Sequence, residues 1–301
     1  MRRTATAPAK INLFLHVGAA DADGYHPLAS LVAFADIGDR VSVQPAERLS
    51  LEVEGPFAPT LAGDNDNLIL RALRCLGQAT GKGPPALKVV LDKQLPIAAG
   101  LGGGSSDAGA ALRLAAQVLG LAADDPALET AAAVVGADGP MCLHARPAWA
   151  EGRGDWLTIE PRLPDLPIVL VNPGVPSPTG PVYRAYDAGP VRSADRPAPP
   201  DDWSPHGVAA WLSRQRNDLE APALSLAPAI GEALAAVAAS QGVLLTRMSG
   251  SGATVFGLYA DDAAARAAGE ALAAHRPEWW VRAGRLQGAQ ANVQLSGDNP
   301  A

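Results

Sequence analysis

The chain has 301 residues, of which 48% are hydrophobic and 18% charged, so it is long and apolar enough to form the cores of two domains. Its 24 lysines and arginines against 31 acidic residues give a net charge of −7, which argues against a nucleic-acid-binding protein that depends on neutralising phosphates. Two cysteines provide neither a disulfide framework nor a zinc-site spacing, and no stretch has the apolar pattern of a signal peptide or a membrane span. We expect a cytoplasmic protein without nucleic-acid or membrane partners, either a monomer or a weak homodimer.

A strand is predicted at 8–17, because apolar and polar residues alternate there. The alternation defines two faces, one with Ile11, Leu13, Leu15 and Val17 and the other with Lys10, Asn12, Phe14 and His16. Lys10 and Asn12 are therefore expected to point the same way. From spacing alone, Lys10 is typical of a solvated charge at a strand edge.

A turn and a helix follow this strand. The segment Asp23-Gly-Tyr-His26 is typical of a surface β-turn whose aromatic residue covers a core edge. Apolar periodicity predicts a helix over 65–79 that carries Cys75 and is capped by Asp64 or Asn65. Glycine and proline at 81–85 then break the chain.

A glycine-rich segment at 95–109 joins a predicted strand over 87–95 to a predicted helix over 108–119. A lone glycine run is more often an ordinary turn, but here the glycines would let an anion approach the backbone at a helix start. Ser105 and Ser106 add hydroxyls at the positive end of the helix dipole. We therefore predict a phosphate-binding loop. The lack of a following lysine disfavours a Walker-type NTPase, and Asp107 stands where a dinucleotide-binding fold needs its third glycine.

Proline and charge concentrate at 161–167, which predicts one domain over 1–160 and a second over 161–301. Before this boundary, Asp138 in front of Gly-Pro is typical of a turn residue, and Cys142 falls in a predicted strand. The second domain is predicted to contain a proline-rich irregular loop over 189–205, for which a specificity lid is the alternative, and then helices over 208–220 and 229–241, strands near Val243 and Thr254, and a final helix and strand.

The segment Pro96-Ile-Ala-Ala-Gly-Leu-Gly-Gly-Gly-Ser-Ser106 resembles the phosphate loop of the galactokinase, homoserine kinase, mevalonate kinase and phosphomevalonate kinase (GHMP) superfamily, with one extra glycine before the serines. Within that superfamily, the Gly-Leu-Gly-Gly-Gly-Ser-Ser-Asp-Ala form and the N-terminal Pro8-Ala-Lys-Ile-Asn-Leu-Phe-Leu15 are similar to the family of 4-diphosphocytidyl-2-C-methyl-D-erythritol kinases. Further segments match in the family's order over most of the chain: Asp23-Gly-Tyr-His26, Gly136-Ala-Asp138, Ala150-Glu-Gly152, Asn172-Pro-Gly174 and Met248-Ser-Gly-Ser-Gly-Ala253.

The resemblance implies an α+β protein with the two-domain GHMP kinase fold, with an N-terminal ribosomal-protein-S5-domain-2-like domain and a C-terminal ferredoxin-like α/β domain. It implies transfer of a phosphoryl group from ATP, with Mg²⁺, to the 2-hydroxyl of 4-diphosphocytidyl-2-C-methyl-D-erythritol, giving the 2-phosphate and ADP in the non-mevalonate isoprenoid precursor pathway. ATP would bind Pro96, Ile97, Ala98, Ala99, Gly100, Leu101, Gly102, Gly103, Gly104, Ser105 and Ser106.

The same resemblance assigns roles to other residues. Asp138 would accept the proton of the substrate hydroxyl, and Lys10 would pair with this carboxylate and offset charge on the transferring group. Asn12 would contact the methylerythritol hydroxyls, and the loop at 248–253 would close over the site from the second domain. Whether Ser105 or Ser106 contacts Mg²⁺, and whether Asp107 does more than extend the polarity of the helix start, stay open.

The cytosine is expected to stack on Tyr25 and to bond with His26, with Tyr183 on its other face and Tyr186 as the competing assignment. Two alternatives remain. A kinase of the homoserine or mevalonate type would have no use for Tyr25 and His26. A non-catalytic nucleotide-binding protein would not need Lys10 and Asp138 in one pocket.

Overall fold

The computed structural model describes residues 1–61, 67–190 and 192–288, and within them ten strands form one sheet. The main strand order is β3-β4-β2-β10-β7-β9-β8, while β1 pairs with β2, and β5 joins β2 to β6. The strands are β1 (Arg3–Val17), β2 (Leu28–Pro45), β3 (Ser50–Glu54), β4 (Leu87–Asp92), β5 (Ala148–Gly152), β6 (Trp156–Ile159), β7 (Leu166–Asn172), β8 (Val243–Met248), β9 (Val255–Tyr259) and β10 (Trp280–Gln287).

The long strand β2 connects the two halves of the chain. One of its edges pairs with β1 along most of its length. The other edge pairs in succession with β5, β10 and β4. Because β10 also pairs with β7, the sheet continues from the first half into the second, and the predicted boundary at 160/161 falls in the connection between β6 and β7.

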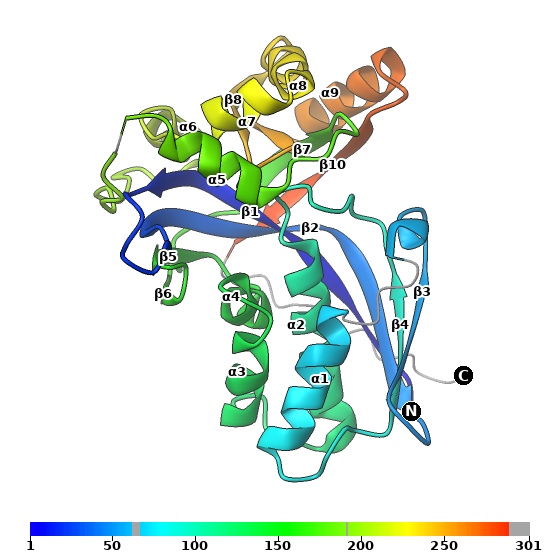
Figure 1. The fold of residues 1–301 in the computed structure, drawn as a ribbon. Helices are drawn as coiled ribbons and strands as arrows, with labels where there is room; N and C mark the ends of the chain where they lie inside the picture. The colour runs from blue at the N-terminus through cyan, green and yellow to red at the C-terminus, as the bar shows by residue number, and fades with distance from the viewer. Residues whose placement is uncertain (62–66, 191, 289–301) are drawn as a thin grey trace.

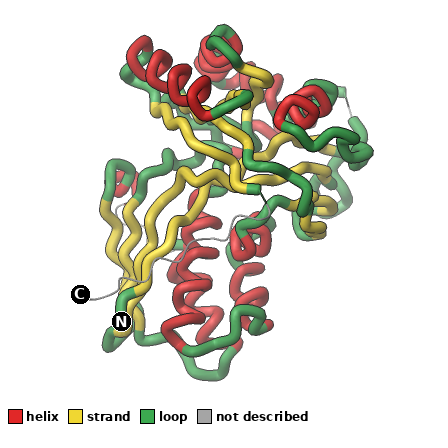
Figure 2. Tube along the Cα trace, turned by 180° about the vertical axis from the view of Figure 1, so that it is seen from behind, coloured by secondary structure: helices red, strands yellow, loops and turns green. Residues whose placement is uncertain are grey.

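Helices from the first half cover one face of β1, β2 and β4 (Figure 1, Figure 2). They are α1 (Leu68–Ala79), α2 (Gly103–Leu119), α3 (Pro126–Ala133) and α4 (Asp138–His144), preceded by the short 3-10 helix η1 (Ala58–Leu61). The helix α2 lies at the centre of this group, in contact with α1, α3, α4 and both long strands. Its start therefore sits where the helical layer meets the sheet.

The second half adds five helices within the described residues: α5 (Thr179–Asp187), α6 (Pro205–Leu212), α7 (Glu220–Leu226), α8 (Ala229–Ala238) and α9 (Asp262–His275). Alternate residues of β7 enter different cores. Val169 and Val171 pack with α8 and α9, whereas Ile168 and Leu170 pack on the opposite face with residues of α6 and β1. The second half is thus a sheet with helices on both faces.

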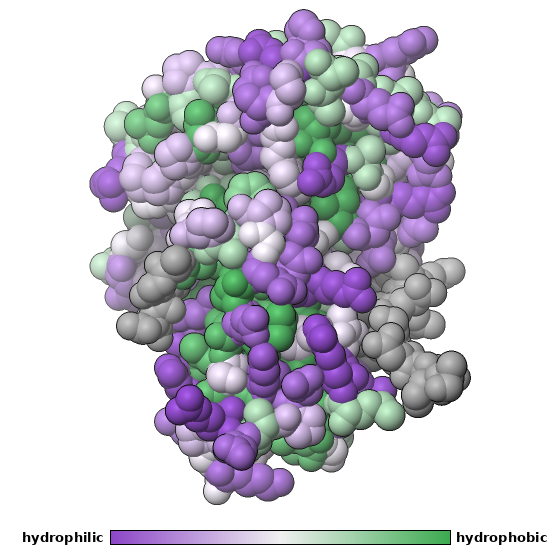
Figure 3. Space-filling view, turned by 90° about the vertical axis from the view of Figure 1, so that its right-hand side faces the viewer, coloured by the Kyte–Doolittle hydropathy of each residue, from purple (hydrophilic) through white to green (hydrophobic). Residues whose placement is uncertain are grey.

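On the face seen in Figure 3, hydrophilic residues are widely spread and hydrophobic ones show between them. Among the described residues, no helix combines the length and the apolar character needed to cross a bilayer.

Several predicted boundaries are wrong. The helix α1 begins at Leu68 and its cap is Asn67, whose side chain accepts the Ile69 N–H, while Asp64 and Asn65 lie outside the described residues. The helix α2 begins at Gly103, so Gly103 and Gly104 belong to its first turn while Gly100 and Gly102 precede it. Cys142 lies in α4 and not in a strand; Pro140 is tolerated there because it occupies the first turn.

The helix predicted over 208–220 is divided into α6 and α7. The reason is tertiary: the intervening chain runs beside β1, where Leu15 donates its N–H to the Arg216 carbonyl and Asp218 donates its N–H to the Leu15 carbonyl. Of the loop predicted over 189–205, the described residues 189–190 and 192–204 are irregular, and Pro205 begins α6. This segment contacts both halves, because Trp211 donates to the Ala198 carbonyl and Arg196 bonds Glu151.

Strict alternation along β1 is also wrong. Asn12 pairs with Val32 and Phe14 with Leu31, so Leu13 is an additional residue in a β-bulge. The bulge reverses the alternation: Leu15 now faces the same side as Lys10 and Asn12, whereas Phe14 turns to the core that contains Ile11. The expected shared orientation of Lys10 and Asn12 is confirmed, because their side chains form a hydrogen bond.

We predict that Gly109→Ala destabilises the protein by about 1–3 kcal/mol through overpacking. A Cβ at this position of α2 would lie 2.4 Å from the backbone oxygen of Cys142 in α4, which cannot move aside like a flexible side chain. Urea unfolding measures the change. The matched control is Gly231→Ala in α8, whose Cβ would stand 3.7 Å from a side-chain carbon of Leu224 and should stabilise by up to about 1 kcal/mol. Equal effects of the two substitutions would contradict the prediction.

Candidate active site

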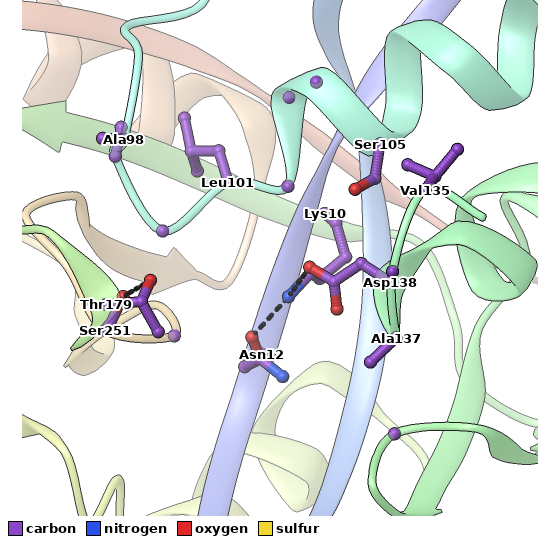
Figure 4. A pocket seen from close by; sticks show the side chains of 18 of the residues that line it. Lys10, Asn12, Ala98, Leu101, Ser105, Val135, Ala137, Asp138, Thr179 and Ser251 are labelled. Carbon is purple, nitrogen blue, oxygen red and sulfur yellow. Dashed lines mark hydrogen bonds and ion pairs between the residues drawn. The ribbon is translucent and has the colours of Figure 1, made fainter. Parts of the chain in front are cut away.

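A cleft of about 960 Å³ opens between the glycine-rich loop, the cleft-facing side of β1, the start of α4 and the start of α5. Figure 4 shows that the labelled residues come from both halves of the chain, with Lys10 and Asn12 on one strand and Thr179 and Ser251 across the cleft. The fold therefore brings together most of the segments that carry the sequence motifs.

Lys10 and Asp138 meet at the centre of this cleft. The Lys10 Nζ lies 3.2 Å from Asp138 Oδ2 and donates to Asn12 Oδ1 at 2.9 Å (Figure 4). The side chain of Lys10 is 8% exposed, whereas that of Asp138 is 35% exposed. Because Asp138 is the first residue of α4, its negative charge also stands at the positive end of a helix. The arrangement presents an oriented carboxylate to the cleft with a fixed cation behind it.

Asn12 links this pair to its surroundings. Its Nδ2 donates to Ser30 Oγ at 2.9 Å, and its backbone N–H donates to Ser249 Oγ at 3.2 Å. Ser249 in turn donates to the Gly100 carbonyl at 2.9 Å. The side-chain amide of Asn12 is thus engaged on both its oxygen and its nitrogen, and its orientation fixes that of Lys10.

The glycine-rich loop is attached to both halves through its backbone. Lys10 donates its N–H to the Leu101 carbonyl at 2.8 Å, and Thr254 donates its N–H to the Ala99 carbonyl at 3.1 Å. Gly100 and Gly102 have φ angles of 74° and 60°, which glycine adopts without strain. A Cβ on Gly100 would lie 2.2 Å from the Ser249 backbone oxygen. The loop geometry therefore requires glycine at these positions.

Ten of the eleven residues expected to contact ATP line the cleft, from Pro96 to Ser105. Ser106 does not. It is fully buried, and its hydroxyl donates to the Pro8 carbonyl at 2.5 Å. The two adjacent serines consequently differ in what they can do, since Ser105 is available to a ligand and Ser106 anchors α2 to β1.

A buried ion-pair cluster under the first turn of α2 was not found from the sequence. The Lys93 Nζ donates to Asp39 Oδ2 and to Asp107 Oδ2, each at 2.6 Å. Burial acts to lower the pKa of Lys93, but Asp107 and Asp39 together raise it above its ordinary value. Burial also raises the pKa of Asp107, whose Oδ1 has no hydrogen-bond partner among the described residues. Asp107 therefore does more than add polarity to the helix start.

An aromatic group lies at the cleft end that α5 covers. The His26 ring is 4.9 Å from that of Tyr183, its Nδ1 is 2.9 Å from the Gly18 carbonyl oxygen, and its Nε2 is 3.2 Å from Asp187 Oδ1. Burial, together with the charge of Asp138, raises the pKa of Tyr183 to about 12. Tyr186 is buried and donates its hydroxyl to the Val17 carbonyl. Of the two competing tyrosines, Tyr183 is the one that lines the cleft.

Tyr25 stands at the mouth of the cleft with 57% of its surface exposed. Arg153, which the sequence analysis did not single out, lies with its guanidinium carbon 4.2 Å from the centre of the Tyr25 ring. It also bonds Asp21 at 2.6 Å and Asp23 at 3.1 Å. A single arginine thus contacts three residues of the loop between β1 and β2. Only proximity in the fold could have identified it.

The loop at 248–253 lies on the opposite wall. Thr179 and Ser251 share a hydrogen bond of 3.0 Å between their hydroxyls (Figure 4), and Asn217 donates to the carbonyls of Met248 and Gly250. Because Gly250 and Ser251 line the cleft, this loop brings the second half of the chain to the site.

Comparison with known proteins agrees with this geometry. Models of the GHMP kinase N-terminal domain and C-terminal domain match residues 67–146 and 207–278. The chain is 54% identical over 289 residues to the 4-diphosphocytidyl-2-C-methyl-D-erythritol kinase of Caulobacter vibrioides, covering 95% of this chain and 100% of the relative. The chain belongs to the family of 4-diphosphocytidyl-2-C-methyl-D-erythritol kinases.

Other relatives of this kinase agree. It is 50% identical to the Cereibacter sphaeroides enzyme of the same name, with 94% of this chain and 99% of that one covered. A crystal structure of 4-(cytidine 5'-diphospho)-2C-methyl-D-erythritol kinase matches at 38% identity with a TM-score of 0.75, covering 96% and 100% of the two chains. A homoserine kinase structure from Cytophaga hutchinsonii, at 18% identity and a TM-score of 0.63 over 95% and 96% of the chains, shares the fold. The expected GHMP kinase fold is confirmed.

We predict that Lys93→Met lowers the free energy of unfolding by about 3–5 kcal/mol, because it leaves two buried carboxylates without their cation. Urea unfolding measures the loss. The matched control is Lys88→Met in β4, the strand that ends just before Lys93, since Lys88 bonds Glu52 at 2.7 Å but the pair is exposed, with side-chain exposures of 42% and 56%. Its expected loss is below about 1 kcal/mol. A loss for Lys93→Met as small as that of the control would refute a structural role for the cluster.

Proposed function

We propose that this kinase transfers the γ-phosphoryl group of ATP to the 2-hydroxyl of 4-diphosphocytidyl-2-C-methyl-D-erythritol, forming the 2-phosphate and ADP. The observation that carries the proposal is the Lys10–Asp138 pair, 3.2 Å apart, beside a glycine-rich helix start in a cleft with an aromatic group at its other end. Names of relatives at 50–54% identity supply the substrate.

The reacting groups have a consistent chemistry. The substrate oxygen attacks the γ-phosphorus while the bond from that phosphorus to the bridging oxygen of ADP breaks, and a carboxylate oxygen of Asp138 receives the hydroxyl proton. The ammonium of Lys10 offsets the negative charge of the carboxylate and the phosphoryl group, and Asn12 holds it in place. Most of the acceleration then comes from positioning and electrostatics rather than from a covalent intermediate.

The phosphates of ATP are placed against the loop from Gly100 to Ser105, where backbone N–H groups and the dipole of α2 favour an anion. Its glycines leave room for close approach, because a Cβ on Gly102 would already lie 3.1 Å from Cε of Lys10.

Mg²⁺ fits this site mainly as a partner of the phosphates. The described residues contain no group of three or more His, Cys, Asp or Glu side chains that could hold a metal ion. Because Ser106 is engaged with Pro8, Ser105 is the serine of the loop whose hydroxyl would be free to offer an oxygen ligand. When bound, the ion would neutralise charge on the transferring phosphates.

The cytidine end of the substrate is placed at Tyr25, His26 and Tyr183. The His26–Tyr183 ring contact and the exposed Tyr25 supply aromatic surfaces for stacking, while the ring nitrogens of His26 already contact the Gly18 carbonyl and Asp187. A small alcohol such as homoserine or mevalonate would leave this end of the cleft unfilled. The aromatic group therefore favours the cytidylated diol over those substrates.

The test of this function is ADP release from the purified protein with ATP and Mg²⁺. The cytidylated diol is compared with homoserine, mevalonate and the diol without its cytidine diphosphate. We expect release with the cytidylated diol alone. Release with another alcohol would overturn the substrate, and absence of release with all of them would favour a non-catalytic nucleotide-binding protein.

We predict that Asp138→Asn lowers kcat by about 100-fold or more, the usual contribution of a general base, because the amide cannot accept the hydroxyl proton. ATP binding should change by less than about 2-fold, since the loop that holds the phosphates is intact. Single-turnover assays with labelled ATP and equilibrium titration measure the two quantities. Unchanged turnover would reject Asp138 as the base.

We predict that Tyr183→Ala raises KM for the cytidylated diol by about 10-fold, the scale of one lost stacking contact, without raising KM for ATP. The matched control is Tyr186→Phe, which removes the bond to the Val17 carbonyl and should lower stability by about 1 kcal/mol without affecting either KM. If the control and not Tyr183→Ala weakens diol binding, the assignment of the two tyrosines is reversed.

A further inference from the structure

The side chain of Arg113 is unusual in its surroundings. It projects from the middle of α2, and no ion pair to a carboxylate is found for it among the described residues. Its Nη1 donates to the carbonyls of Cys142 at 2.8 Å and Leu143 at 2.7 Å. Its Nε and Nη2 are shielded from solvent and have no hydrogen-bond partner in the described part of the chain. Burial lowers the pKa of Arg113 to about 10, so it stays charged at neutral pH. Burying a charged group with two unpaired donors is energetically unfavourable, so its presence at this position requires a structural or functional explanation.

The two carbonyls belong to the last turn of α4, the short helix that begins with Asp138. Carbonyls in the last turn of a helix lack partners within the helix, and a cation there is favoured by the helix dipole. With seven residues, α4 is too short to be stable by itself. Its position therefore depends on tertiary contacts, of which Arg113 supplies two hydrogen bonds.

The helix α2 also holds the strand that carries Lys10. Ser106, in the first turn of α2, donates to the Pro8 carbonyl of β1 at 2.5 Å. Two turns farther along, Arg113 bonds α4, and between them Gly109 lets the α2 and α4 backbones approach closely. One rigid helix thus fixes three things at once: the glycine loop at its own start, the strand that presents Lys10 and the helix that presents Asp138.

We propose that Arg113 is a positioning residue for phosphoryl transfer: by binding the last carbonyls of α4, it holds the Asp138 carboxylate in register with Lys10 and with the loop at the start of α2. The inference rests on the proposed function, because it needs Asp138 to act in the reaction. Without Arg113, α4 would be free to shift along α2. Small displacements of a reacting group are enough to lower a rate by about 100-fold.

The test is Arg113→Met, which keeps the length and bulk of the side chain but removes its donors and charge. We expect kcat with the cytidylated diol to fall about 10- to 100-fold, while KM for ATP and ATP binding change by less than about 2-fold. We also expect the backbone amides of α4, and not those of α2, to exchange hydrogen about 10-fold faster. A folded Arg113→Met protein with the parent's kcat, or one that loses ATP binding as much as turnover, would overturn the proposal.

A double variant separates positioning from a general structural role. If Arg113 acts through Asp138, adding Arg113→Met to Asp138→Asn should lower the residual rate by less than about 2-fold. The matched control is Arg247→Met in β8, since Arg247 likewise donates to carbonyls, those of Leu13, Leu212 and Gln215, but touches no part of α4. Arg247→Met should lower kcat by the same factor in the parent protein and in the Asp138→Asn variant. If Arg113→Met also lowers the rate by the same factor with and without Asp138→Asn, the two residues act independently and the proposal is overturned.

Two further measurements keep the test decisive if the first variant or the parent protein fails. If Arg113→Met does not fold, Arg113→Lys retains the charge and should show a smaller loss of kcat and faster exchange of α4; parental values of both would overturn the proposal. The parent protein is assayed first. A parent without turnover of the cytidylated diol rejects the proposed function, whereas the exchange of α4 amides still tests the contact made by Arg113.

Discussion

The site depends on how the first turn of α2 is held against the sheet. Lys93 lies between Asp39 of β2 and Asp107 of α2, and the three buried charges join β4, β2 and the helix start. Asp39 also accepts the N–H groups of Gln94 and Leu95, which fixes the chain as it enters the glycine loop. In a low-dielectric environment such contacts are directional and costly to break. The loop can therefore be rich in glycine and still keep one shape.

The same loop links the two halves of the chain through hydrogen bonds. Its carbonyls at Ala99 and Leu101 accept N–H groups of Thr254 and Lys10, and Gly100 accepts the Ser249 hydroxyl. A segment that faces the phosphates is thus bonded on one side to the strand with Lys10 and on the other to the loop that closes the opposite wall. Displacing either half would disturb the backbone that is to hold the nucleotide.

Features that depend on periodicity or on a local motif could be predicted from the sequence, whereas contacts between residues far apart in the chain could not. The glycine loop and the common direction of Lys10 and Asn12 followed from motif and period, and the fold class followed from the resemblance that several motifs carry together. The bulge at Leu13 could not be foreseen, because it reflects how β2 pairs. The division of the helix over 208–220 results from contact with β1, and Lys93, Arg113 and Arg153 owe their significance to partners 14 to 132 positions away. Such pairs leave no periodic signal in a single chain.

The bulge in β1 determines which side of the sheet each following residue of that strand faces. Before it, Ile11 enters the core beneath α6; after it, Leu15 and Val17 enter the core beneath α8 and α9. Loss of Leu13 itself would restore regular pleating and leave Phe14 and Leu15 on the sides that they now occupy. A residue inserted between Phe14 and Leu15 would instead exchange the two sides of everything that follows and withdraw Leu15 from the cleft. The orientation of Leu15 and Val17 therefore depends on the number of residues that follow the bulge, and an insertion there should be tolerated less well than a substitution or the loss of Leu13.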